Sequence, residues 1–130
     1  MFLAVFALIV GTSYGQATTQ KTETGVASFD NMNFDFGKIK QGVPVTHEFK
    51  FTNTGKAPIV ITNAQPSCGC TIPDWSKDPI PPGGKGYVKA TYNAAAPGAF
   101  DKSITVMANV ENGVVMLRFH GEVVANTPNN

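Results

Sequence analysis

The fold is decided by the stretch Val45-Thr46-His47-Glu48-Phe49-Lys50-Phe51-Thr52. One set of alternate positions is apolar except for His47, and the other set is polar. This period of two is typical of a β-strand with one buried face. The next residues, Asn53-Thr54-Gly55, predict a turn, because asparagine and glycine tolerate the backbone angles that turns require.

Short segments of the same type, separated by turns, fill most of the remaining chain. Further strands are predicted at 27–30, 34–36, 58–62, 87–92, 102–110 and 114–124. Gly37 marks a bend or bulge, residues 75–86 form a loop rich in proline and glycine, and Asn112-Gly113 predicts a type I′ hairpin turn. Because no helical pattern occurs, the sequence predicts an all-β fold, an immunoglobulin-like β-sandwich of about seven to eight antiparallel strands. The predicted core consists of Phe29, Phe36, Phe49, Phe51, Ile59, Ile61, Val88, Ala90, Tyr92, Ile104, Val106, Leu117, Phe119 and Val123.

Composition excludes several classes of function. The 130 residues have a formal net charge of +1, and 15% of them are charged, below the roughly 25% of average globular chains. No cluster of basic residues is present, so a nucleic-acid partner is not expected. The sequence contains no Ser-His-Asp set, glycine-rich phosphate loop or HExxH pattern, and its aspartates fall in turns and loops. We therefore expect a protein that is not an enzyme.

The N-terminus predicts export. Residues 1–10 form an apolar run, and Ser13 and Gly15 suit the −3 and −1 positions of a signal-peptidase site before Gln16, although no basic residue precedes the run. The run is shorter than the roughly 20 residues of a transmembrane helix, so no stable membrane insertion is expected once the leader is removed. The expected location is the periplasm, the cell envelope or the extracellular space. The expected parts are a signal peptide, a flexible polar lead-in, the sandwich domain and a polar tail, at 1–15, 16–25, 26–125 and 126–130.

The only two cysteines, Cys68 and Cys70, offer the one place for chemistry. On a regular strand their Cα atoms would lie about 6.6 Å apart, near the upper limit of disulfide geometry, although Gly69 allows the backbone to tighten. A disulfide would open a role in thiol exchange. Two thiolates are too few for structural zinc but could hold Cu(I) with a third ligand. The candidates for that ligand are His47, His120, Met107 and Met116. Two packed cysteines, or a loop clip, remain the third alternative.

Two other kinds of side chain are candidates for a role. His47 lies on the apolar face of its strand and is expected at the core or rim, whereas His120 shares the solvated face with Met116. Trp75 begins the proline-rich loop. It either caps the open end of the sandwich near the cysteines or contacts a partner, because exposed tryptophan is typical of binding hot spots.

Several blocks together resemble a bacterial family of exported domains. They are Phe51-Thr52-Asn53-Thr54-Gly55, Pro58-Ile59-Val60-Ile61, Cys68-Gly69-Cys70-Thr71, Pro81-Pro82-Gly83, Pro97 to Val106, and Phe119-His120-Gly121-Glu122-Val123. The family is domain of unknown function fifteen seventy-three, similar in architecture to ASPM–SPD-2–Hydin-type domains and more distantly to major sperm protein and pilus-chaperone domains. The resemblance implies a sandwich of seven or eight strands over about residues 29–124, located in the envelope or outside the cell. It implies no activity.

The expected function is an exported, non-catalytic module for protein interaction or envelope assembly, with an unidentified protein partner. Pairing of a partner with an edge strand is one expected mode. The alternative is a thiol-based site at Cys68 and Cys70, for redox exchange or Cu(I) binding.

Overall fold

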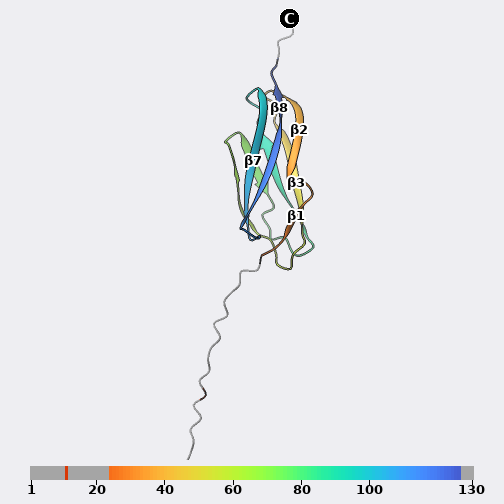
Figure 1. Cartoon of the computed structure of the whole chain (residues 1–130), viewed down its shortest axis with the longest axis vertical. Coiled ribbons are helices and arrows are strands. Elements are labelled where there is room, and N and C mark those ends of the chain that lie inside the picture. The colour runs from red at the N-terminus through yellow and green to blue at the C-terminus, as the bar shows by residue number, and fades with distance from the viewer. Residues whose placement is uncertain (1–10, 12–23, 127–130) are drawn as a thin grey trace, which may run out of the picture.

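Eight β-strands and no helix make up the part of the chain that the structure describes, residue 11 and residues 24–126 of a computed structural model (Figure 1). The strands are β1 (Ala27–Phe29), β2 (Asn33–Lys40), β3 (Val45–Asn53), β4 (Ile61–Pro66), β5 (Thr71–Trp75), β6 (Lys85–Tyr92), β7 (Gly98–Ala108) and β8 (Val114–Val124). Within these residues, nothing forms a helix that is long and apolar enough to cross a membrane. The predicted signal peptide (apart from Gly11), residues 16–23 of the predicted lead-in and the end of the predicted tail lie outside the described residues.

The strands form two four-stranded sheets that pack face to face. One sheet has the order β1-β3-β6-β5 and the other has the order β2-β8-β7-β4. In Figure 1, β7, β8 and β2 lie in one layer and β3 and β1 in the layer behind it. The apolar core fills the space between the layers. The predicted all-β, immunoglobulin-like sandwich is confirmed.

Three details of the predicted strands are wrong. The β2–β8 pair is parallel and not antiparallel, because the chain crosses from one sheet to the other between β1 and β2. The strand expected at 58–62 begins at Ile61 and extends to Pro66. The expected loop from residue 75 is preceded by β5, which the sequence hides because Pro73 interrupts the strand pattern. Proline is tolerated there because β5 is an edge strand.

The core matches the sequence pattern closely. Of the fourteen predicted core residues, all are buried except Phe29 and Phe36, which are half-buried against the same cluster. The structure adds further buried residues, namely Ala57, Ala64, Ile80, Ala94, Phe100 and Val110. Phe100 belongs to an aromatic group with Tyr92 and Phe119, and its ring stacks on Tyr92 with centroids 4.3 Å apart. A core of this size explains why a chain of this length needs no staple to fold.

Two predicted glycine positions behave as expected. Gly37 has φ 68° and coincides with a register shift between Asp35 and Lys38, so β2 contains the expected bulge. Asn112 and Gly113 have φ of 66° and 75°, as a type I′ turn requires, and they join β7 to β8.

A buried asparagine holds one end of the sandwich together. Asn53 is fully buried, and its side-chain amide donates to the carbonyl oxygens of Ala57 and Ile80 at 2.8 and 3.0 Å. Its side-chain oxygen accepts from the backbone N–H groups of Gly55 and Val26 at 3.0 and 3.4 Å. One side chain therefore satisfies four backbone groups from three separate segments, where secondary structure cannot do so.

Candidate functional site

Cys68 and Cys70 form a disulfide in the turn that joins β4 to β5. This turn is where the chain passes from one sheet to the other, because β4 and β5 are edge strands of opposite sheets. The ladders hold it on both sides, since Ser67 N–H donates to the Ser103 carbonyl at 2.8 Å and Asn93 N–H donates to the Cys70 carbonyl at 3.0 Å. Backbone hydrogen bonds on both sides therefore hold the disulfide in place.

The geometry of this disulfide differs from the expectation for a regular strand. The Cα atoms of Cys68 and Cys70 are 5.3 Å apart, because the chain turns between them, and this distance lies well inside the usual disulfide range. A cross-link around a single residue closes a very short loop. In the chain-entropy picture it stabilises the fold by only roughly 1–2 kcal/mol, far less than a long-range cross-link. Its value as a structural staple is small.

The two cysteines have unequal surroundings. Both cysteines are half-exposed, but Cys70 packs against the hydrophobic core and Cys68 does not belong to the residues that do so. Gly69 between them is exposed, and no atom lies within 4 Å of the place where a side chain would begin. Thr71, the next residue, is 3% exposed, and within the described part of the chain its hydroxyl oxygen has no hydrogen-bond partner. A buried, unpaired hydroxyl is costly and therefore uncommon.

The candidate third ligands do not lie beside the cysteines. Pro66, two residues before Cys68, pairs with Ile104, so Met107 lies about 10 Å farther along β7 at ~3.3 Å per residue. Met116 is on β8, and among the described residues no three His, Cys, Asp or Glu side chains gather as a metal site would require. Cu(I) binding would need both sulfurs as thiols and stays a prediction for the reduced chain.

His47 lies between the two sheets, as the alternation of β3 predicts. Its ring stacks on Phe34 of β2 with centroids 3.6 Å apart, and it meets Phe49 edge-on at 4.6 Å. Burial lowers the pKa of His47, and the neighbouring Glu48 carboxylate opposes this shift. The imidazole therefore acts as an apolar contact between β3 and β2.

His120 ties β8 to β2 at the surface. Its Nδ1 lies 3.2 Å from the Asn33 side-chain oxygen, and its Nε2 lies 3.7 Å from the Asp35 carboxylate. The Asp35 carboxylate also accepts from the N–H of Gly37 at 2.7 Å and so supports the bulge. All of these partners belong to the parallel pairing of β2 with β8, and the cluster is therefore best explained as a structural one.

Trp75 is half-buried and packs against the core at the end of β5. The Lys77 ammonium lies 3.2 Å from the centre of its ring and 3.8 Å from the Asp74 carboxylate. The lysine therefore covers the ring face that a partner would have to reach. A partner contact at Trp75 stays a prediction.

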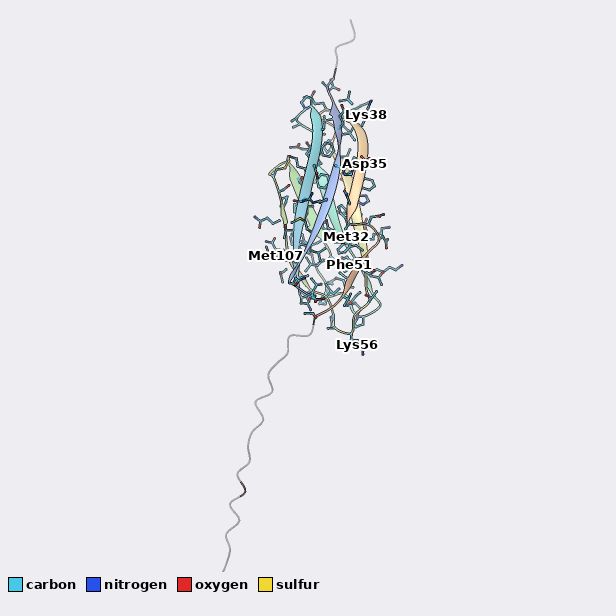
Figure 2. The ribbon with its side chains drawn as sticks, viewed as in Figure 1. Met32, Asp35, Lys38, Phe51, Lys56 and Met107 are labelled. Carbon is cyan, nitrogen blue, oxygen red and sulfur yellow. A yellow bond between two sulfur atoms is a disulfide. The ribbon has the colours of Figure 1, made fainter. Side chains whose placement is uncertain are left out.

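Sequence reasoning missed an apolar surface on the outer face of the β2-β8-β7-β4 sheet. Val114 and Met116 on β8 are 47% and 50% exposed, and Met107 pairs with Val114 across the β7–β8 ladder. Met32, 48% exposed, lies just before β2, and its carbonyl accepts from the N–H of Arg118. Figure 2 labels Met107 of β7 and Met32, which precedes β2, in the lower half of the domain. The signal was present in the outward positions of residues 114–124, where Val114 and Met116 precede the polar Arg118, His120 and Glu122.

The edges of the two sheets are poorly suited to pairing with a further strand. Along an edge strand, the backbone groups of alternate residues point toward the neighbouring strand and toward the open edge. The backbone hydrogen bonds of Ser67 and Cys70 point toward the neighbouring strands β7 and β6. The backbone nitrogens of Pro66 in β4 and Pro73 in β5 therefore face the open edges. Proline has no N–H to offer an incoming strand. In β4, the other outward N–H, that of Ala64, already donates to the Asn63 side chain at 2.9 Å.

The opposite edges are protected in other ways. β1 has only three residues, and β2 is interrupted by its bulge and bears Lys38 and Lys40. Short strands, bulges and lysines are the devices by which sheet edges avoid pairing. The expected mode of edge-strand pairing is thus disfavoured at all four edges of the described domain, and the outer faces are the better surfaces for a partner.

The immunoglobulin-like sandwich is similar in fold to a PapD-like domain of known structure. The PapD-like domain 7 of human CEP192 matches with a TM-score of 0.62 at 11% identity, and the match covers 98% of this chain and 100% of that domain. A protein of unknown function from Porphyromonas gingivalis W83 gives a TM-score of 0.69 at 16% identity, over 78% of this chain and 48% of that one. The secreted serine protease VesC from Vibrio cholerae matches with a TM-score of 0.60 at 18% identity. That match covers 78% of this chain and 24% of the protease. At these identities the matches show the fold alone.

The chain belongs to the family described as Protein of unknown function (DUF1573), whose family model matches residues 27–123. The resemblance inferred from the sequence blocks is therefore confirmed. No curated protein matches the chain. The chain spans about half the length of the Porphyromonas protein and about a quarter of the Vibrio protease.

Proposed function

We propose that this chain is an exported, non-catalytic module that binds a protein partner through the outer face of the β2-β8-β7-β4 sheet. The observation behind this proposal is an apolar group on β7 and β8, with Val114 and Met116 exposed and Met107 half-buried opposite Val114. We call these three residues, together with the exposed Met32 just before β2, the methionine face. Large apolar side chains that gather on the outside of a sheet mark interaction surfaces more often than isolated ones do.

The chemistry of the methionine face suits a protein ligand. Methionine is unbranched and polarisable, so it adapts its shape to a partner's apolar side chains and is common on binding surfaces. Arg118 and His120 follow Met116 along the same face of β8 and supply a polar border. An apolar centre with a polar rim is the usual anatomy of a protein interface.

The disulfide supports export. Disulfides persist in oxidising compartments such as the periplasm and are rare in the cytosol. Cys68 and Cys70 account for both cysteines of the chain. Together with the predicted leader, this pairing favours the periplasm, the cell envelope or the extracellular space.

The test is affinity capture with matched surface variants. The full chain, a Met116→Lys variant and an Ile72→Lys variant are immobilised and exposed to envelope extract, and the retained proteins are quantified by mass spectrometry. Ile72 is a suitable control because it is 69% exposed and lies on the other sheet. We expect Met116→Lys to weaken binding of the retained partner by at least about tenfold, since a charge replaces a central apolar contact.

Binding is then measured with the purified partner, and thermal melting verifies that both variants are folded. Ile72→Lys is expected to bind as the unchanged chain does. Equal binding by Met116→Lys, or a partner lost only with Ile72→Lys, would contradict the proposed face. Recovery of no reproducible partner would contradict the proposed function itself.

A further inference from the structure

The two sulfur atoms of the disulfide are not equivalent toward an attacking thiolate. Cys70 packs against the core, so its sulfur has protein on one side, whereas Cys68 stands outside that contact. Gly69, between the two cysteines, is exposed, and no atom lies within 4 Å of the place where its side chain would begin. Because thiol–disulfide exchange requires approach to one sulfur, access favours attack on Cys68.

Thr71 is the residue that follows Cys70, and its hydroxyl has an unused capacity for a hydrogen bond. Thr71 is 3% exposed, and its Oγ1 has no partner among the described residues. A hydroxyl can donate one hydrogen bond, and a thiolate accepts such a bond more strongly than a disulfide sulfur does. Reduction of the disulfide would create a thiolate acceptor on the residue that immediately precedes this unpaired donor.

We propose that Cys68-Gly69-Cys70-Thr71 is a thiol–disulfide exchange site that accepts electrons from a dithiol, with Thr71 stabilising the Cys70 thiolate. The inference does not depend on the proposed interaction through the methionine face. A thiolate of the dithiol attacks Cys68 Sγ, the Cys68–Cys70 bond breaks, and Cys70 leaves as a thiolate that receives the hydrogen bond of Thr71.

The second thiol of the dithiol then completes the step. As its thiolate, it attacks the mixed disulfide and releases Cys68 as a thiolate, which takes up a proton from solvent. The dithiol becomes a disulfide and loses two electrons, and Cys68 and Cys70 gain them as two thiols. In the opposite direction, the Cys68 thiolate, which lies outside the core contact, is the nucleophile, and the core-packed Cys70 resolves the mixed disulfide.

The surrounding fold suits repeated opening of this bond. The backbone on both sides is fixed by the hydrogen bonds from Ser67 to Ser103 and from Asn93 to Cys70, neither of which involves a sulfur. The one-residue loop means that the folded chain loses little stability when the bond is reduced. The sandwich is therefore expected to stay folded in both redox states.

The first experiment measures the thiol pKa of Cys70 in a Cys68→Ser background, by thiolate absorbance near 240 nm as the pH is varied. Thr71→Val removes the hydroxyl and keeps the shape of the side chain, and Thr71→Ser keeps the hydroxyl. We expect Thr71→Val to raise the titration midpoint by about one pH unit, a tenfold loss of thiolate, as for one hydrogen bond to the charged form. Thr71→Ser is expected to stay close to the Thr71 parent.

The second experiment tests the direction of attack. Cys70→Ser and Cys68→Ser leave one thiol each, and formation of the mixed disulfide with oxidised glutathione is followed by intact mass. We expect the Cys68 thiol to react at least about tenfold faster than the Cys70 thiol, because only Cys68 lies outside the core contact. Urea unfolding of each variant identifies any effect that comes from a loss of structure.

Three results would overturn the inference. One is an equal Cys70 midpoint for Thr71→Val and Thr71→Ser. Another is faster reaction at Cys70 than at Cys68. The third is a disulfide that excess dithiothreitol fails to reduce in the folded, unchanged chain.

Discussion

The two ends of the β1-β3-β6-β5 sheet are held by opposite means. At one end, the buried amide of Asn53 joins three segments through hydrogen bonds alone. At the other end, beyond the pairing of Thr71 with Tyr92, the turn is closed by a covalent bond between half-exposed cysteines. The Asn53 side chain uses both amide hydrogens and its oxygen in hydrogen bonds, whereas among the described residues the Thr71 hydroxyl at the covalent end has no partner.

The two ends are therefore expected to contribute very different amounts to the stability of the fold. A satisfied buried amide is costly to remove, because each lost partner leaves a backbone group unpaired away from water. Reduction of a disulfide that spans one residue is expected to lower the free energy of unfolding only slightly, because such a cross-link restricts the unfolded chain little. The covalent end is therefore expected to contribute less to the stability of the fold, and it is the end at which we propose thiol chemistry. Lys56, in the turn that follows Asn53, marks the hydrogen-bonded end in Figure 2.

Replacement of the buried amide is expected to have the largest effect. Asn53→Ala removes the partners of two carbonyl oxygens and two N–H groups, so we expect a loss of about 3–5 kcal/mol in the free energy of unfolding. Urea denaturation measures this loss. Asn63→Ala is a matched control, because Asn63 is exposed and caps only the N–H of Ala64. Similar losses for the two variants would contradict the role assigned to Asn53.

Replacement of a glycine by alanine is expected to destabilise the hydrogen-bonded end more than the disulfide end. A Cβ at Gly86 would clash with the Phe51 ring and lie 3.0 Å from Cγ1 of Ile80, so Gly86→Ala is expected to cost about 1–3 kcal/mol by overpacking. Gly69→Ala at the disulfide turn meets no atom within 4 Å and is expected to change stability by less than about 0.5 kcal/mol. Thermal and urea unfolding of both variants test the contrast. An equal destabilisation would show that the disulfide turn is as tightly packed as the hydrogen-bonded end.

The sequence predicted what is local in this structure. β3 follows from alternation, and the β7–β8 hairpin follows from Asn112-Gly113, because both signals reside in neighbouring residues. The parallel partner of β2 was not predictable, since strand neighbours are chosen by packing across the whole chain. β5 was hidden by Pro73, whose tolerance depends on its edge position.

The candidate site was predicted only in part. The spacing of Cys68 and Cys70 indicated a feasible disulfide, but the alternation rule overestimated their separation because it could not supply the turn between them. The unpaired hydroxyl of Thr71 depends on what surrounds it in the core, and no pattern in the sequence reports that. The partners of Asn53 include Val26 and Ile80, each 27 residues away, so the asparagine appeared only as a turn residue.

The smallest expected effect concerns His47, which lies on β3 between the two ends. Burial lowers its pKa below the ordinary 6.5, so in the pH range just below 6.5 the unfolded chain binds more protons than the folded chain. The contribution of neutral His47 is therefore complete above pH 6.5 and is lost as the pH falls through the lower pKa of the folded state. His47→Phe keeps an aromatic ring against Phe34 and removes the proton site. Urea midpoints at pH 7.5, 6.5 and 5.5 should fall more steeply for the unchanged chain than for His47→Phe. Parallel pH curves would show that the stacked imidazole accepts its proton as readily when folded as when unfolded.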